Sequence, residues 1–231
     1  MARTMIKYLI MTIIWHGQSC FQMTAARNKG EQISILIDPF SEEIGLRLPK
    51  LESDILLISH QHRGHNNVKA VSGSPFIING PGEYEVKNVF IEGIRSWHDD
   101  KGGNERGENT IYTIETEDLR LCHLGDFGQK ELTGEQLDRI GQIDILMLPV
   151  GGIATISAKE ALKVMSQLEP KIVIPMHYRI PKLNPSVCGK LDGLDIFLKT
   201  VGIKSIEPQN KLLIKKKEIS SEEVKIIALK P

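Results

Sequence analysis

The change of rhythm near residue 133 constrains the fold of this 231-residue chain more than any other feature. Before it, short β-rich runs follow one another with polar or glycine-containing turns between them, namely MTIIWHG (11–17), CFQMTAA (20–26) and QISILIDPF (32–40). After it, amphipathic helices alternate with apolar runs. This order predicts two sheets packed together with helices outside. We therefore expect an α/β fold, a four-layer αββα sandwich of two mixed β-sheets flanked by helices.

Further runs in the first part strengthen this expectation. EYEVKNVFIEGIRSWH (83–98) and NTIYTIETEDLRLCHLGD (109–126) predict hairpins, the second with its turn at Glu117-Asp118. SDILLISH (53–60) is almost continuously apolar, which is typical of a strand covered on both faces. A cluster of three histidines begins at the end of this strand.

The second part carries clear helix signals. Thr133 and Ser157 each precede a predicted helix, and Gln136 and Glu160 stand three residues later, as in a capping box. The second helix should stop before Pro170. One more helix and two terminal strands are expected at LDGLDIFLKTVG (191–202), KLLIKK (211–216) and VKIIAL (224–229). No repeat, low-complexity tract or linker-like shift in composition divides the chain, so we expect a single domain over residues 1–231.

The charge balance argues against a nucleic-acid partner. Lys plus Arg and Asp plus Glu both number 29, so the formal net charge is zero. Nothing in the overall charge attracts nucleic acid or an anionic membrane. KLLIKKKE (211–218) is the one basic run, and we interpret it as a solvated strand edge. We expect a small-molecule substrate, and the sequence leaves open whether the chain forms a homo-oligomer.

The cysteines and the N-terminus bear on the cellular compartment. Cys20, Cys122 and Cys188 are far apart and form no CxxC pair, which favours reduced thiols in a cytoplasmic protein. The apolar stretch in MARTMIKYLIMTIIW (1–15) is too short to span a bilayer and predicts a first strand, so no membrane partner is expected. Met5 and Met11 are alternative starting residues.

Histidines concentrate at the ends of the predicted strands. SHQHRGHNN (59–67) places His60, His62 and His65 within six positions, and histidine is the commonest metal ligand. His60 and His62 are two apart, so in an extended segment they point the same way. His123 is followed by Asp126 in a Gly-Asp turn that can bring both side chains to one ion. His177 follows another buried strand, and together these residues predict a metal site.

The same residues resemble a known signature. HQHRGH, then His123 with Asp126, then His177, are similar to the His-x-His-x-Asp-His pattern of the metallo-β-lactamase superfamily with its distant His, Asp and His. The opening WHGQSCF (15–21) and Asp38-Pro39 resemble the branch of ascorbate-6-phosphate lactonase and uncharacterised metal-dependent hydrolases. The resemblance extends from about residue 11 to residue 180. It is specific for the superfamily and not for a substrate.

The resemblance implies a set of metal ligands. A first metal would be held by His60, His62 and His123, and a second by His65 and His177, with Asp126 bridging both. The family has an aspartate where this chain has Gly64, which cannot ligate. We therefore expect a tight first metal and a weaker or differently coordinated second one.

The chemistry that follows is hydrolysis. Three protein ligands with an open position are typical of a catalytic metal, which lowers the pKa of its water to about 7. We expect a metal-dependent hydrolase that uses a metal-bound hydroxide on a small ester, lactone or phosphate-type substrate, with Asp126 positioning the hydroxide. One or two divalent ions are expected, zinc first, with manganese or iron as alternatives. A phosphodiesterase or nuclease of the same superfamily, and a non-catalytic metal-binding protein, remain as other hypotheses.

Several residues outside the signature are further candidates. His98 precedes the glycine-rich segment DDKGGNERGEN (99–109) and is a candidate proton donor, substrate contact or replacement ligand compensating for Gly64. Arg106 in that segment is a candidate contact for an anionic substrate, with a solvated loop charge as the alternative. Asp38 is expected to orient a ligand histidine rather than to bind metal. His16 and Gln18 either line the pocket or pack at the strand end.

Overall fold

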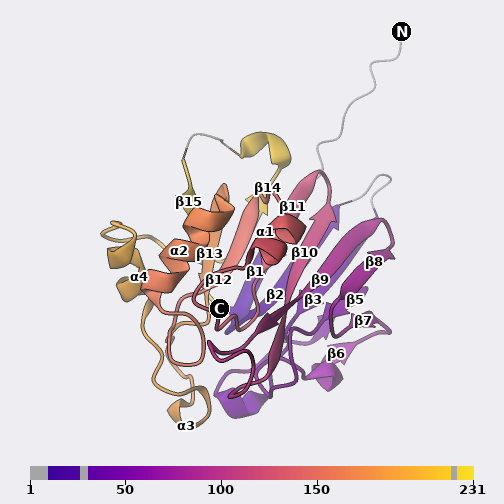
Figure 1. Ribbon diagram of the computed structural model, residues 1–231. Helices are drawn as coiled ribbons and strands as arrows, with labels where there is room; N and C mark the ends of the chain where they lie inside the picture. The colour runs from indigo at the N-terminus through magenta and orange to yellow at the C-terminus, as the bar shows by residue number, and fades with distance from the viewer. Residues whose placement is uncertain (1–9, 27–30, 220–222) are drawn as a thin grey trace.

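Two β-sheets packed face to face make up the centre of the molecule (Figure 1). The computed structural model describes residues 10–26, 31–219 and 223–231, with residues 187 and 188 described by their backbone alone. The first sheet has the order β14-β1-β2-β3-β5-β7 and the second the order β15-β13-β12-β11-β10-β9-β8. Each sheet mixes parallel and antiparallel pairs. The predicted α/β arrangement of two mixed sheets with helices is confirmed.

The strands of the first sheet are β14 Leu212–Ile214, β1 Met11–Gly17, β2 Cys20–Ala26, β3 Gln32–Ile37, β5 Ile55–Leu57 and β7 Phe76–Ile78. Those of the second are β15 Lys225–Ile226, β13 Ile172–Met176, β12 Ile145–Pro149, β11 Leu119–His123, β10 Glu108–Thr116, β9 Val89–Trp97 and β8 Gly82–Val86. A separate pair, β4 Leu51–Glu52 and β6 Val71–Ser72, lies outside both sheets.

Alternation of side chains explains how the first sheet faces the second. In β1 every second residue is buried, and Met11, Ile13 and Trp15 all belong to the main core. Because successive side chains of a strand point to opposite faces, this run lays one apolar row against the other sheet. Strand β12 is buried at every position, which fits its place inside the second sheet beneath the helices.

The hairpin predictions are also confirmed. Strands β10 and β11 pair antiparallel around Glu117 and Asp118, whose φ angles are +55° and +61°. Lys87 and Asn88 make the corresponding turn between β8 and β9, with φ angles of +49° and +55°. Two consecutive left-handed residues give the turn a twist that matches the flanking strands, so the register of both hairpins is fixed.

Three helices, α1 Gly134–Ile140, α2 Ala158–Leu168 and α4 Leu194–Thr200, cover the outer face of the second sheet. A fourth, α3 Pro185–Cys188, packs against the segment after β3. Both predicted capping boxes are present, since Thr133 and Gln136 bond reciprocally, as do Ser157 and Glu160. Helix α2 connects the parallel strands β12 and β13 and packs beside α4 (Figure 1). No helix in the described residues is long and apolar enough to cross a bilayer.

The outer face of the first sheet is covered differently. A second, smaller core joins Cys20, Leu36 and Leu56 to Phe40 and Ile44 from the segment after β3. That segment contains only a short 3-10 helix, η2 Glu42–Ile44, against which α3 packs. Two further 3-10 helices are η3 Val68–Ala70 and η4 Lys216–Glu218. Loops and single turns therefore form most of this layer.

Two cysteines are among the buried residues. Cys20 lies in the smaller core and Cys122 in the main core, and both thiols are free. Burial raises the pKa of both thiols well above the ordinary value. Neither is available as a thiolate ligand at neutral pH.

Candidate metal centre

Several chain segments meet at one end of the two sheets. Five of them carry predicted site residues: the β1–β2 turn, the loop after β5, the end of β9, the turn after β11 and the end of β13. The cavity that they border has a volume of about 550 Å³. The residues lining it are Gln18, Ile44, Gln61, His62, Arg63, Gly64, His65, His98, Arg106, Asp126, Ala154, His177 and Ser186. Most of the predicted site residues are thus gathered at one place.

The carboxylate of Asp126 is at the centre of this group. Its Oδ2 lies 3.1 Å from Nε2 of His65, 3.3 Å from Nε2 of His177 and 3.4 Å from Nε2 of His98. The Nε2 of His60 is 3.9 Å away. Four imidazoles from three segments, the loop after β5 and the ends of β9 and β13, therefore direct the same ring atom at one buried oxygen.

Local structure holds Asp126 in this position. Its Oδ1 accepts a hydrogen bond of 3.0 Å from the hydroxyl of Ser19, and its backbone N–H donates to Oδ1 of Asn109. The preceding Gly125 has a φ of +58°, and a Cβ there would lie 2.3 Å from Oδ1 of Asn109. Only glycine can therefore make this turn, which explains the Gly-Asp pair seen in the sequence.

Asp38 organises the histidine loop from below. It is fully buried, and its two oxygens accept from the backbone N–H and the hydroxyl of Ser59 at 2.7 and 2.6 Å. The hydroxyl of Ser59 is 2.9 Å from Nδ1 of His60, and Oδ2 of Asp38 is 3.0 Å from Nδ1 of His65. An outer oxygen partner on one ring nitrogen directs the other toward a metal. The structure places Asp38 as predicted, behind the histidines.

The histidine ring nitrogens that face one another in this cluster are suited to binding a cation. His60 Nε2 is buried and has no hydrogen-bond partner among the described residues, although buried polar atoms are normally paired. The ligand atoms of His60, His62 and His98 lie within 4.8 Å of one another, and so do those of His60, His65 and Asp126. Imidazole nitrogens with one carboxylate suit zinc, manganese or iron. The residues present therefore fit the divalent metal that the histidine pattern implies.

Electrostatics points the same way. Burial alone would lower the pKa of His65, but the charges of Asp126 and Asp38 outweigh it and raise this pKa to about 10. Burial, reinforced by the charge of His65, lowers the pKa of His60 far below its ordinary value. Burial would raise the pKa of Asp126, but the charges of His177 and His65 hold it well below the usual range. A proton on His65 thus occupies a place where positive charge is strongly favoured.

His123 is not part of this cluster, in contrast to the ligand set that the resemblance implied. Its Nε2 donates to the carbonyl of Ser19 at 2.9 Å, and its Nδ1 accepts from the N–H of Gly125 at 3.1 Å. The ring is fully buried and packs edge-on against Phe21 at 5.8 Å between centroids. Both ring nitrogens are used by the backbone, so the structure places His123 beneath the site, bracing Ser19.

His98, and not His123, lies beside His60 and His62 in the cluster. It is 2% exposed, and its ring centroid is 4.7 Å from that of His60 and 5.1 Å from that of His62. It follows strand β9, just as His123 ends β11, so the strand-end argument applied to both. The pairing of β9 with β10 helps to decide which of them reaches the cluster, and unlike the β10–β11 hairpin this pairing is not visible in the local sequence.

Three residues at the site have backbone angles that are unusual for non-glycine residues. Gln18, Asp38 and His177 have φ angles of +48°, +49° and +52°. Such conformations cost on the order of 1–3 kcal/mol each and persist only where the surroundings enforce them. Gln18 also turns its Oε1 into buried space with no partner among the described residues. The β1–β2 turn and the end of β13 thus have left-handed backbone conformations at Gln18 and His177, two residues that line the cavity.

Gly64 faces the cavity with open space beside it. No heavy atom would lie within 4 Å of a Cβ built there, and its backbone is not left-handed. Asp126 is the single acidic residue among the described ones that line the cavity. The glycine therefore leaves room where the family pattern has a carboxylate.

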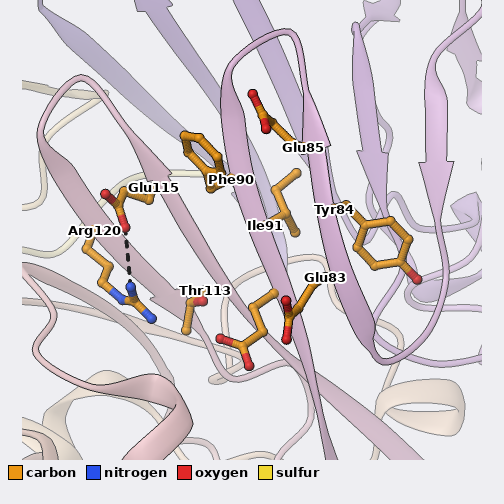
Figure 2. Close-up of a pocket in the computed structure, with 9 residues that line it drawn as sticks. Glu83, Tyr84, Glu85, Phe90, Ile91, Thr113, Glu115 and Arg120 are labelled. Atoms are coloured by element: carbon orange, nitrogen blue, oxygen red, sulfur yellow. Dashed lines mark hydrogen bonds and ion pairs between the residues drawn. The ribbon is translucent and has the colours of Figure 1, made fainter.

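A second hollow lies on the outer face of the second sheet (Figure 2). Its volume is about 370 Å³, and it is lined by Glu83, Tyr84, Glu85, Phe90, Ile91, Glu92, Thr113, Glu115 and Arg120. Glu115 is paired with Arg120 at 3.2 Å, and Glu92 with Arg139 at 2.8 Å. None of its residues belongs to the groups of close metal-ligand atoms found among the described residues, so we assign no metal to it.

Comparison with known proteins establishes the class. A family model described as "Beta-lactamase superfamily domain" matches residues 12–177, a range that includes all seven histidines and Asp126. The fold and the histidine cluster agree with that match. The chain belongs to the metallo-β-lactamase superfamily.

Within the superfamily the chain is similar to the UPF0173 proteins. A UPF0173 metal-dependent hydrolase of Thermococcus onnurineus is 30% identical over 192 residues, 70% of this chain and 82% of the relative. A UPF0173 protein of Pyrococcus abyssi is 30% identical over 190 residues, 73% and 83% of the two chains.

Solved structures give the same picture. A candidate Zn-dependent hydrolase of the metallo-β-lactamase superfamily from Thermotoga maritima matches with a TM-score of 0.74 and 34% identity, covering 95% of this chain and 98% of that chain. A metallo hydrolase from Ignicoccus hospitalis shares the fold with a TM-score of 0.61 at 18% identity, covering 89% and 99%.

Proposed function

We propose that this protein is a metal-dependent hydrolase acting on a small ester, lactone or phosphate-type substrate. One observation supports this most directly: four Nε2 atoms lie within 3.1 to 3.9 Å of the buried Oδ2 of Asp126 at the base of an open cavity. The names of the UPF0173 relatives and of the Thermotoga maritima protein support the same class.

The proposed ligands differ at one residue from those that the sequence resemblance implied: His98 replaces His123. We assign His60, His62 and His98 to a first ion, because their ligand atoms lie within 4.8 Å of one another. His65 and His177 would hold a second ion, and Asp126 is available as a ligand to either ion. Zinc is the first choice of metal, and manganese or iron are the alternatives. When bound, such an ion supplies a water of lowered pKa and polarises the bond to be cleaved.

The protein residues contribute orientation and charge. Asp38 and Ser59 fix the rings of His65 and His60 through their Nδ1 atoms, so that both Nε2 atoms face Oδ2 of Asp126. Ser19 holds one oxygen of Asp126 and leaves the other free to face the imidazoles. We infer that Asp126 orients the attacking water, and that His98 acts as a ligand and not as the proton donor considered from the sequence.

The remaining expectations belong to the same proposal. Residues 1–231 act as one domain in the cytoplasm, with a small molecule as substrate and no nucleic acid or membrane as partner. The zero net charge and the buried, free Cys20 and Cys122 support this reading.

The test has two parts. Metal content is measured after dialysis on wild type and on the His60→Ala, His98→Ala and His123→Ala variants, and hydrolysis is measured on a panel of lactones, esters and phosphodiesters. We expect His60→Ala and His98→Ala to lose metal, and wild type to hydrolyse at least one member of the panel. Full retention of metal by His60→Ala and His98→Ala would refute the ligand assignment. Cleavage of phosphodiesters alone would identify the phosphodiesterase alternative. Bound metal without any hydrolysis would favour a metal-binding protein.

A further inference from the structure

The mouth of the cavity is positively charged although the chain as a whole is not. Arg63 and Arg106 both line it, and among the described lining residues only Asp126 is acidic. The formal net charge of the whole chain is zero, so this charge is concentrated locally. A cavity lined by one sign of charge attracts ligands of the opposite sign.

Arg106 is presented by a loop that is built around one carboxylate. Oδ1 of Asp99 accepts from the backbone N–H groups of Lys101 and Gly103 at 2.8 and 2.9 Å, and Oδ2 accepts from those of Glu105 and Arg106 at 3.0 and 2.7 Å. Burial would raise the pKa of Asp99, but these four donors outweigh it and hold this pKa at about 2. We call residues 99–107 the Asp99 loop.

The base of the Asp99 loop is joined to the histidine cluster. The N–H of His98 donates to the carbonyl of Gly107 at 3.0 Å, and the N–H of Gly107 donates to that of Gly103 at 3.0 Å. The same strand end therefore supplies His98 to the cluster and begins the loop that carries Arg106. The backbone that carries Arg106 is consequently anchored beside His98.

The two arginines differ in their availability. Nη1 of Arg63 is 2.7 Å from Oε2 of Glu43, so its charge is already partly matched. The guanidinium of Arg106 has no ion pair among the described residues. Arg106 lines the same cavity as His62, His65 and His98, so its unpaired guanidinium is on the cavity that holds the cluster.

A neutral polar group faces the same cavity. Gln18 is 3% exposed and lines the cavity, and its Oε1 has no partner in the described part of the chain. A buried amide oxygen without a partner is costly unless something else satisfies it. Since asparagine and glutamine amides can turn over, Gln18 can offer either a donor or an acceptor to a bound molecule.

We propose that this cavity selects substrates that carry an anionic group, a phosphate or a carboxylate, which is bound by Arg106 with Gln18 beside it. The inference rests on the proposed function and names its class of substrate. Arg106 is the specificity-determining residue, and Asp99 is a positioning residue that acts through Arg106. Guanidinium is suited to this role because its planar donors match phosphate and carboxylate oxygens.

The test measures binding of two anions to the metal-loaded protein by calorimetry. Phenylphosphonate represents a phosphate and benzoate a carboxylate, and the preferred anion distinguishes these two sources of charge. Arg106→Gln should weaken binding of the preferred anion about tenfold or more, since a charge-assisted hydrogen bond contributes roughly that factor. Lys101→Gln is the matched control: it removes one positive charge from the same loop but does not line the cavity, and should change affinity less than about twofold.

Asp99 is tested through a double-mutant cycle. Asp99→Asn should weaken anion binding in wild type but have no further effect in the Arg106→Gln background, because it acts by placing the arginine. Metal content is measured for every variant. If Arg106→Gln binds the anions as tightly as wild type with its metal retained, the inference is overturned while the proposed function stands. Failure of metal-loaded wild type to bind either anion also overturns it. A wild type that retains no metal refutes the proposed function itself.

Discussion

Gly64→Asp should strengthen the second metal site. The substitution restores the carboxylate of the family pattern at a position that lines the cavity between His62 and His65. A Cβ there meets no atom within 4 Å and the backbone is not left-handed, so the folded state should accept it without strain. Replacing a glycine without strain stabilises a protein by about 0.4–1 kcal/mol. In the metal-free protein, repulsion from Asp126 will offset part of this gain.

The effect on metal affinity can be bounded. Two unit charges 4 Å apart attract by about 4 kcal/mol at an effective dielectric constant of 20, and desolvation of the new carboxylate removes a large part of that. We expect a net gain of about 1.4 kcal/mol, a tenfold tighter second ion. The first ion, held by His60, His62 and His98, should be unaffected.

Calorimetric titration with zinc, beside melting curves, checks this prediction. Gly64→Ala controls for the backbone, and Gly64→Asn controls for the shape of the side chain without its charge. The aspartate variant should exceed both in second-site affinity while all three melt close to wild type. The prediction is wrong if wild type already binds two ions with equal, high affinity and Gly64→Asp changes neither affinity.

Three further predictions follow from the site. The folded pKa of His65 is about 10, above its ordinary value of 6.5, so its stabilising effect on metal-free protein is complete below about pH 6.5 and is lost as pH rises through 10. Urea unfolding with chelator present should show this decline in wild type and a flatter profile in His65→Gln; equal slopes would contradict it. Asp126→Asn should lower the metal content. It should also lower turnover of any accepted substrate more than it lowers the affinity for that substrate; unchanged turnover would refute the role of Asp126. His123→Gln should lower the melting temperature, since buried hydrogen bonds to Ser19 and Gly125 are disturbed, yet keep its metal; metal loss in a folded His123→Gln protein would make it a ligand after all.

Much of the fold could be predicted from local signals. Thr133 and Ser157 marked their helices through capping boxes, and Glu117-Asp118 marked the β10–β11 turn. Helix α3 has four residues, and strands β4 and β6 have two each. Elements this short show no hydrophobic periodicity, so the sequence did not predict them. The loop layer over the first sheet was missed for the same reason: its apolar residues, such as Phe40 and Ile44, follow no helical or strand period.

The metal-site residues could be predicted only in part from local sequence. His60, His62 and His65 were found because they are close in sequence, and His177 because it ends a buried strand. Choosing between His98 and His123 required knowing which strand end reaches the cluster. A sign of the difference was present in the sequence: His98 precedes the glycine-rich Asp99 loop at the open rim, whereas His123 lies within LCHLG, an apolar setting suited to a buried ring.

The spacing of the ligands along the chain also affects how metal influences folding. His60, His62 and His65 stay within six residues of each other even in an unfolded chain, whereas His98, Asp126 and His177 join them only after both sheets have packed. The unfolded chain therefore keeps a three-imidazole chelator of its own. Because metal that also binds the unfolded state stabilises the native state less, added zinc should raise the melting temperature by less than the native affinity alone would give. Refolding without metal, followed by loading, should accordingly give cleaner protein than refolding in its presence.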